Sequence, residues 1–231
     1  MKNIRALAII PARGGSKRLP KKNLQLLGGI PLAEHTLKAA SDSGCFAKIF
    51  LSSDNPDILA LAAKFPDVEP MLRPEALSGD HVTALTVVKA IIEQPGIAEQ
   101  YNTVALMLPT APFRTAKHVK EAFRLLTPDV DGVISLAPLN YPPQLSVTLE
   151  GLTIRPLFDP SPLHTGKTRS QDQGVTYRPN GGIYIQWLDR FSINQNFWKG
   201  NINGLVMSED ESVDIDTQND LDYANFLLTR K

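Results

Sequence analysis

The sequence IIPARGGSKRLPKKN spans residues 9–23 and joins an apolar segment to a loop rich in glycine and cations. The run before it, residues 4–10, is almost entirely apolar, which is typical of a β-strand covered on both faces of a sheet. The loop has two glycines, one serine and five cations, and no Asp or Glu occurs from Ala6 to Ala33. Glycine lets backbone N–H groups approach an anion, and the cations offset its charge. The stretch therefore predicts a buried strand that ends at a site for a nucleotide triphosphate.

Strand and helix patterns alternate along the chain after this loop. The apolar segments predict strands at residues 48–53, 68–72, 103–108 and 133–136. Between them, periodic apolar residues and capping signals predict helices at residues 31–43, 56–64, 82–93 and 116–126. Strands and helices that alternate in this way form crossover units. We therefore expect an α/β fold with a mostly parallel sheet and helices on both faces.

The alternation breaks at Pro138, and prolines and polar residues dominate residues 138–180. Residues 145–149 and 152–154 read as a hairpin around Glu150 and Gly151. Such an excursion is either a substrate lid or an arm that contacts another subunit. The chain then returns to the sheet at residues 182–186 and 205–207, and Thr217 with Asp220 has the spacing of a helix capping box. We predict a single domain, residues 1–231, with an inserted arm at about 138–180.

Composition excludes several classes of partner. The 231 residues include 24 Lys and Arg against 24 Asp and Glu, so net charge gives no support for binding nucleic acid or a membrane surface. No stretch approaches a transmembrane span, and the apolar run before Pro11 is too short for the core of a signal peptide. The single cysteine, Cys45, excludes an intrachain disulfide and reads as a small buried apolar residue. We therefore expect a cytoplasmic protein.

A second charged region lies near the C-terminus, where residues 201–228 contain no Lys or Arg. Asp214 and Asp216 are two residues apart, so an extended backbone would turn both carboxylates to one side. Two carboxylates together with substrate phosphates are a usual ligand set for Mg²⁺. The alternative is that Asp216 or Thr217 caps a helix and Asp214 is solvated.

The glycine-rich loop matches neither standard nucleotide fingerprint, the Walker A loop or Gly-x-Gly-x-x-Gly. It nevertheless follows the first strand, and ligands of open α/β sheets bind at the carboxyl ends of strands. The groups expected to meet a triphosphate here are Arg13, Ser16, Lys17, Lys22 and Asn23; the alternative is a solvated basic loop. Asp54 and Arg73 also follow strands. Asp54 reads either as a further carboxylate of the site or as part of a turn, and Arg73 as a phosphate ligand or one half of a surface ion pair.

Six motifs occur in order along the chain: PARGGSK at 11–17, PKKN at 20–23, LRP at 72–74, PTAPFR at 109–114, RPNG at 178–181 and DIDT at 214–217. Together they resemble the acylneuraminate cytidylyltransferases, the family of the CMP-sialic acid and CMP-nonulosonic acid synthetases. The resemblance implies a nucleotidyltransferase that moves CMP from CTP to the anomeric hydroxyl of a nine-carbon 2-keto sugar acid and releases pyrophosphate. It also implies a Rossmann-like nucleotidyltransferase fold and a homodimer in which the arm reaches the partner's site.

The same resemblance assigns roles to individual residues. It implies that Arg13 and Lys22 hold the phosphates and that Asp214 and Asp216 bind Mg²⁺, so these four are the expected catalytic residues. The residues expected around the substrates are Ala12, Gly15, Ser16, Lys17, Asn23, Arg73, Val82, Thr83, Ala84, Leu108 and Thr110.

Two departures from the family pattern concern the sugar side of the site. Leu108 stands where sialic acid synthetases commonly have Gln, and Ser170 stands where they often have a second Arg before Gln171. Fewer polar groups then face the sugar, and an unmet buried polar group costs about 1–3 kcal/mol. This favours a deoxygenated nonulosonic acid as acceptor. The alternatives are a transferase that uses 3-deoxy-octulosonate or a sugar 1-phosphate, and a non-catalytic nucleotide-binding module.

Overall fold

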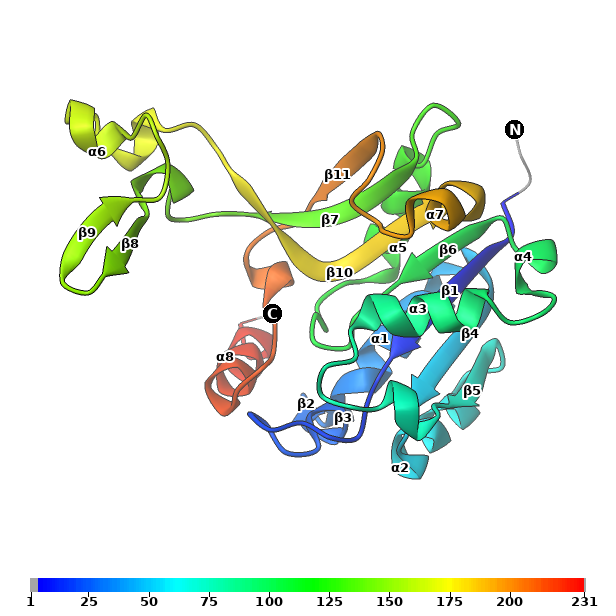
Figure 1. Ribbon diagram of the computed structural model, residues 1–231. Coiled ribbons are helices and arrows are strands. Elements are labelled where there is room, and N and C mark those ends of the chain that lie inside the picture. The colour runs from blue at the N-terminus through cyan, green and yellow to red at the C-terminus, as the bar shows by residue number, and fades with distance from the viewer. Residues whose placement is uncertain (1–3, 231) are drawn as a thin grey trace.

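A computed structural model describes residues 4–230 and contains a central sheet of seven strands (Figure 1). The strand order is β11-β7-β10-β6-β1-β4-β5. All neighbouring pairs are parallel except those of β10, which runs antiparallel to both β6 and β7. The expected α/β fold with a mostly parallel sheet is therefore confirmed. The strands are β1 (Ala6–Pro11), β4 (Phe46–Ser53), β5 (Val68–Leu72), β6 (Thr103–Leu106), β7 (Gly132–Pro138), β10 (Tyr177–Trp187) and β11 (Ile202–Val206).

Helices cover both faces of this sheet. On one face α1 (Leu32–Ser43) and α5 (Ala116–Leu125) pack against each other and the strands, burying Leu37 and Val119. On the other face lie α3 (Ala84–Ile92) and α7 (Leu188–Asn194), which bury Val88 and Phe191 and stand in front of the sheet in Figure 1. Burial on both faces explains why β1 is apolar at nearly every position.

A third apolar cluster joins the two ends of the chain. Helix α8 (Gln218–Leu228) packs on the small hairpin of β2 (Leu26–Leu27) and β3 (Ile30–Pro31). Gly28 and Gly29 form the turn of this hairpin, with φ values of 58° and 81° that favour glycine. Thr217 and Asp220 form the expected capping box at the start of α8. This packing holds the acidic segment before α8 next to the loop that follows β1.

The inserted arm leaves the sheet after β7 and returns to it as β10. It contains β8 (Val147–Glu150), β9 (Thr153–Pro156) and the one-turn helix α6 (Pro162–Thr165), and it projects away from the main body (Figure 1). The expected hairpin is confirmed, because β8 and β9 pair antiparallel. The remaining short helices are α2 (Pro56–Leu59) and α4 (Ile97–Gln100), with 3₁₀ turns at Lys22–Leu24, Ala60–Lys64, Glu75–Leu77, Pro143–Leu145, Ser170–Asp172 and Asp210–Ser212.

Three local predictions were wrong. The helix expected at residues 56–64 is α-helical only over Pro56–Leu59 and continues as a 3₁₀ turn; it ends at Lys64 because Phe65, which precedes Pro66, is extended. Strand β10 begins at Tyr177, well before residue 182, since pairing with β7 extends it across Pro179. Cys45 is only partly buried, because it lies at the turn that enters β4.

Within residues 4–230, no helix is long and apolar enough to cross a membrane.

Candidate active site

The site lies at the edge of the sheet where the parallel strands end. Strand β1 is the topological switch point of the sheet, with β4 on one side and β6 on the other. Because these strands and β5 are parallel, the segments that follow them meet at one edge. This brings together Arg13, Asp54, Arg73 and Thr110, which are far apart in the sequence.

A cavity of about 170 Å³ opens at this edge. Most of its lining consists of residues that the sequence assigned to substrate binding: Arg13, Lys22, Asn23, Arg73, Val82, Ala84, Leu108 and Thr110. Pro11, Val87 and Pro109 complete the lining. The cavity has cations from the glycine-rich loop and from the segment after β5, and apolar side chains from α3 and the turn after β6.

The other expected substrate residues lie around this cavity without lining it. Ala12 is fully buried, and its N–H donates to the Ser52 carbonyl (2.9 Å). Thr83 caps α3, because its hydroxyl accepts the N–H of Thr86 (3.1 Å). Gly15, Ser16 and Lys17 form the outer part of the loop.

Two hydrogen bonds fix the backbone of the glycine-rich loop. The N–H of Gly14 donates to Oδ1 of Asp54 (2.7 Å), so Asp54 holds the loop. A Cβ at residue 14 would lie 2.8 Å from Cβ of Asn55, a distance that only glycine avoids. Farther along, Nδ2 of the buried Asn23 donates to the Arg13 carbonyl (2.8 Å). The loop is thus held open in a defined shape.

Arg73 is buried and lines the cavity, and it forms no ion pair with any carboxylate of residues 4–230. Its Nη2 donates to the Ser52 carbonyl (2.7 Å), and its Nε donates to Oγ of Ser52 (3.3 Å). Burial lowers the pKa of Arg73, and the nearby Asp54 carboxylate opposes that shift. The end of β4 therefore positions the guanidinium.

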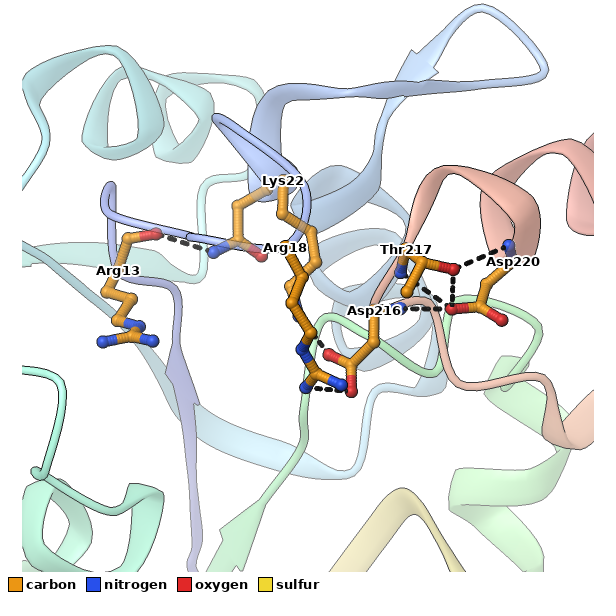
Figure 2. A network of polar contacts seen from close by, with 7 residues as sticks. Arg13, Arg18, Lys22, Asp216, Thr217 and Asp220 are labelled. Carbon is orange, nitrogen blue, oxygen red and sulfur yellow. Dashed lines mark hydrogen bonds and ion pairs between the residues drawn. The ribbon is translucent and has the colours of Figure 1, made fainter.

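Carboxylates pair with most of the cations of the loop. Asp216 receives Nζ of Lys22 on Oδ1 (2.7 Å) and Nη2 of Arg18 on Oδ2 (2.5 Å) (Figure 2). Burial alone would raise the pKa of Asp216, but Lys22 and Arg18 outweigh it and lower that pKa. Asp80 similarly receives Arg13 (2.9 Å) and Lys17 (2.5 Å), and these hydrogen bonds lower its pKa. The basic and acidic regions of the sequence therefore meet in one site.

Asp214 differs electrostatically from its neighbour Asp216. Protein atoms crowd its carboxyl although part of the residue stays exposed, and this burial raises its pKa; the Asp216 charge adds to the rise. The Thr110 side chain opposes this rise in the pKa of Asp214, and the Thr110 carbonyl accepts the N–H of Ile215 (2.8 Å). The turn after β6 therefore holds the acidic segment. On its other side Asp214 borders a second hollow of about 570 Å³ that Arg178 also lines.

Sequence reasoning missed the roles of Asp80, Arg18 and Ser52. The cationic run of the sequence suggests no partner for Arg18, and Asp80, next to the exposed His81, belongs to none of the six motifs. The partners of Arg18 and Asp80 lie far away in the sequence, so no local pattern signals them.

Within residues 4–230, no three His, Cys, Asp or Glu side chains gather as a metal site. Asp214 and Asp216 supply two carboxylates beside the cations of the glycine-rich loop. Such a pair, completed by phosphate oxygens, matches the oxygen ligands that Mg²⁺ takes.

Residues 7–137 match the sequence model of the cytidylyltransferase family. The chain belongs to this family. Its membership confirms the nucleotidyltransferase class expected from the sequence motifs. The matched region contains β1, the glycine-rich loop, Arg73 and the turn after β6.

Several characterised cytidylyltransferases resemble the chain over most of its length. It is 33% identical to the CMP-N,N'-diacetyllegionaminic acid synthase of Legionella pneumophila, covering 99% of this chain and 96% of that protein. It is 32% identical to the pseudaminic acid cytidylyltransferase of Campylobacter jejuni, covering 98% and 96%. It is 31% identical to the N-acylneuraminate cytidylyltransferase of Escherichia coli, covering 97% of this chain but 52% of that protein.

Among solved structures, a CMP-2-keto-3-deoxy-manno-octonic acid synthetase complexed with CTP has a TM-score of 0.69. The similarity covers 98% of this chain and 99% of that one at 15% identity. At that identity it shows a shared fold, and this confirms the Rossmann-like nucleotidyltransferase architecture of the cytidylyltransferase.

Proposed function

We propose that this cytidylyltransferase moves CMP from CTP to the anomeric hydroxyl of a nonulosonic acid and releases pyrophosphate. The observation that carries the proposal is the meeting of Arg13, Lys22 and Arg73 with the Asp214–Asp216 segment at the switch point of the sheet. The names of the relatives support the acceptor class, because they act on legionaminic, pseudaminic or N-acylneuraminic acids.

The cavity divides into two chemical environments that suit a nucleotide. Val82 and Ala84 offer apolar surface for the nucleoside, while Arg13 and Lys22 offer charge for the phosphates. In phosphoryl transfer, catalysis comes chiefly from positioning and charge stabilisation. We assign to Arg13 and Lys22 the stabilisation of the negative charge that builds on the leaving pyrophosphate when the acceptor hydroxyl attacks the α-phosphorus.

Asp214 and Asp216 are the residues proposed to hold Mg²⁺. When bound, the ion would neutralise phosphate charge and lower the pKa of the acceptor hydroxyl. Asp216 is bound by Lys22 and Arg18 in the free protein, so it would exchange these partners as phosphates take up the cations. Asp214 would supply the second carboxylate from its place beside Thr110.

The surroundings of the cavity support a narrower acceptor proposal. Leu108 lines the cavity with an isobutyl side chain and offers no amide to a sugar hydroxyl. We propose a deoxygenated nine-carbon acid, which presents fewer hydroxyls there. The relatives named for legionaminic and pseudaminic acids are consistent with this preference.

We also propose that the arm makes the protein a homodimer. The β8–β9 hairpin exposes Leu149, Leu152 and Ile154, and Leu152 has 97% of its surface accessible. A monomer rarely leaves such a group of apolar side chains in water. Sedimentation of the wild type should give a dimer, and Leu152→Glu should shift it toward monomer; a monomeric wild type would contradict the proposal.

The activity is tested by measuring pyrophosphate release from each nucleoside triphosphate with Mg²⁺ and a panel of acceptors. The panel contains nine-carbon 2-keto acids, an eight-carbon 3-deoxy acid and sugar 1-phosphates. We expect release with CTP and a nine-carbon acid, and a loss of about 10²–10³ in kcat for Asp214→Ala, the size of one preorganised electrostatic contact. Pyrophosphate release only with a sugar 1-phosphate would overturn the proposal. The absence of release with every acceptor in the panel would overturn it as well.

A further inference from the structure

Arg114 lies in the interior of the protein beneath the active site. It follows the turn that leaves β6, and 2% of its surface is accessible. Among the residues that the structure describes, no carboxylate pairs with it, and burial lowers its pKa to about 9. An unpaired cation in a protein interior is costly, so such a residue needs a reason.

The guanidinium joins three parts of the fold. Nη1 donates to the Gly182 carbonyl of β10 (2.6 Å), and both Nη1 and Nη2 donate to the Leu108 carbonyl (3.2 Å each). Nη2 also donates to Oγ1 of Thr36 in α1. Nε has no hydrogen-bond partner in the described part of the chain. Only the planar fork of Arg reaches several acceptors from one buried position.

These bonds determine how the turn after β6 faces the site. The Leu108 carbonyl is drawn inward to Arg114, while the Leu108 side chain, Pro109 and Thr110 line the cavity. Thr110 then reaches the acidic segment: its carbonyl accepts the N–H of Ile215 (2.8 Å), the residue next to Asp214, and its side chain lowers the pKa of the Asp214 carboxyl. A continuous set of contacts thus leads from the buried guanidinium to a carboxylate of the site.

We infer that Arg114 is a positioning residue of the active site, which fixes the 108–110 turn and, through Thr110, the placement of Asp214. Its effect on rate rests on the proposed function, whereas its effect on the turn does not. The fork supplies what an apolar residue of equal volume could not, a common anchor for a carbonyl of β10 and a carbonyl of the turn after β6.

Hydrogen exchange tests the structural half of this inference without any substrate. In Arg114→Lys a single ammonium replaces the fork, and in Arg114→Met the charge is lost. We expect the Ile215 amide to exchange at least about tenfold faster in both variants. This amide donates to the Thr110 carbonyl, and both variants lose hydrogen bonds from the charged fork to the turn that carries this carbonyl. Gln186→Leu is the matched control, since it removes another fully buried donor to a carbonyl, at the opposite end of β10.

A double-mutant cycle tests the functional half. Thr110→Val is made in the wild type and in Arg114→Lys. We expect the losses in kcat caused by Thr110→Val and by Arg114→Lys to be non-additive, because both substitutions act through the contact of Thr110 with Asp214. A merely structural Arg114 would lower the folded fraction and leave the two losses additive. Gln186→Leu combined with Thr110→Val should be additive.

Each outcome decides the inference. Unchanged exchange at Ile215 in a folded Arg114→Lys protein, additive losses, or failure of both Arg114 variants to fold would overturn it. Faster exchange at Ile215 in a protein that shows no cytidylyl transfer would instead reject the proposed function and keep the structural half of the positioning role.

Discussion

Asp80 holds two of the cations that are proposed to receive the triphosphate, and removing its charge should strengthen CTP binding. Its carboxylate meets Nη1 of Arg13 at 2.9 Å and Nζ of Lys17 at 2.5 Å. The phosphates must displace this carboxylate to use those cations. In Asp80→Asn, Arg13 and Lys17 are released and the local negative charge that opposes the phosphates is gone.

The exposure of the three side chains limits the size of the effect. Arg13 is 36% exposed, Asp80 44% and Lys17 83%, so water screens both pairs. An exposed ion pair changes an equilibrium by up to about fivefold. Loss of two pairs should therefore tighten the dissociation constant for CTP by about 2- to 25-fold, and high salt should shrink the difference.

Calorimetric titration of CTP into wild type and Asp80→Asn at low and high salt measures this effect. Asp42→Asn is the control, because it removes one charge from an exposed pair with Lys38 (2.8 Å) on α1 and should leave CTP affinity unchanged. If Asp80→Asn binds CTP no tighter than the wild type, the carboxylate does not compete with phosphate. Weaker binding would mean that Asp80 orients Arg13 for the nucleotide.

Three further changes probe other parts of the molecule. Arg73→Met should weaken CTP binding by at least about tenfold in calorimetry, because a cavity-lining cation is lost, but should barely move the melting temperature. Retained affinity would remove Arg73 from the site. Asp214→Asn should raise the melting temperature near pH 7 but not near pH 3. The pKa of Asp214 is raised in the folded state, so the wild type loses stability as the pH rises above the pKa of the unfolded chain, whereas the neutral Asn does not titrate. An equal shift at both pH values would contradict this sign. Thr217→Ala should cost about 1 kcal/mol in urea unfolding by removing the cap of α8, whereas Thr229→Ala at its other end should cost less than about 0.5 kcal/mol. Equal costs would show that the cap is not what stabilises the helix.

Local patterns were sufficient to predict much of the fold. The apolar run before Pro11, the periodic apolar residues of the helix at 116–126 and the Thr217 capping box each depend on residues a few positions apart. The predicted substrate residues cluster because parallel strands end at one edge, which follows from the crossover pattern. Motif order along the chain was enough to indicate the family.

What could not be predicted depends on contacts between distant residues. The antiparallel course of β10 is set by its two neighbours in the sheet, and its early start overrides the unfavourable Pro179. Asp80 and Arg13 are 67 positions apart, and Arg114 and Gly182 are 68 apart. No spacing rule predicts such pairs, so the partners of the loop cations and the anchor of the turn emerge only from the folded structure.

The arm joins the sheet through two strands that are themselves neighbours. Tyr177 pairs with Pro138, and the N–H of Leu139 donates to the Thr176 carbonyl (2.9 Å), so the insertion begins and ends at one rung of the ladder. Replacing everything between these residues by a tight turn would convert β7 and β10 into an ordinary hairpin. The insertion is therefore separable in structural terms, because the register of β7 and β10 is set by their own pairing and not by the residues between them. A deletion variant that keeps the wild-type circular dichroism spectrum would show this independence directly, and one that unfolds would refute it.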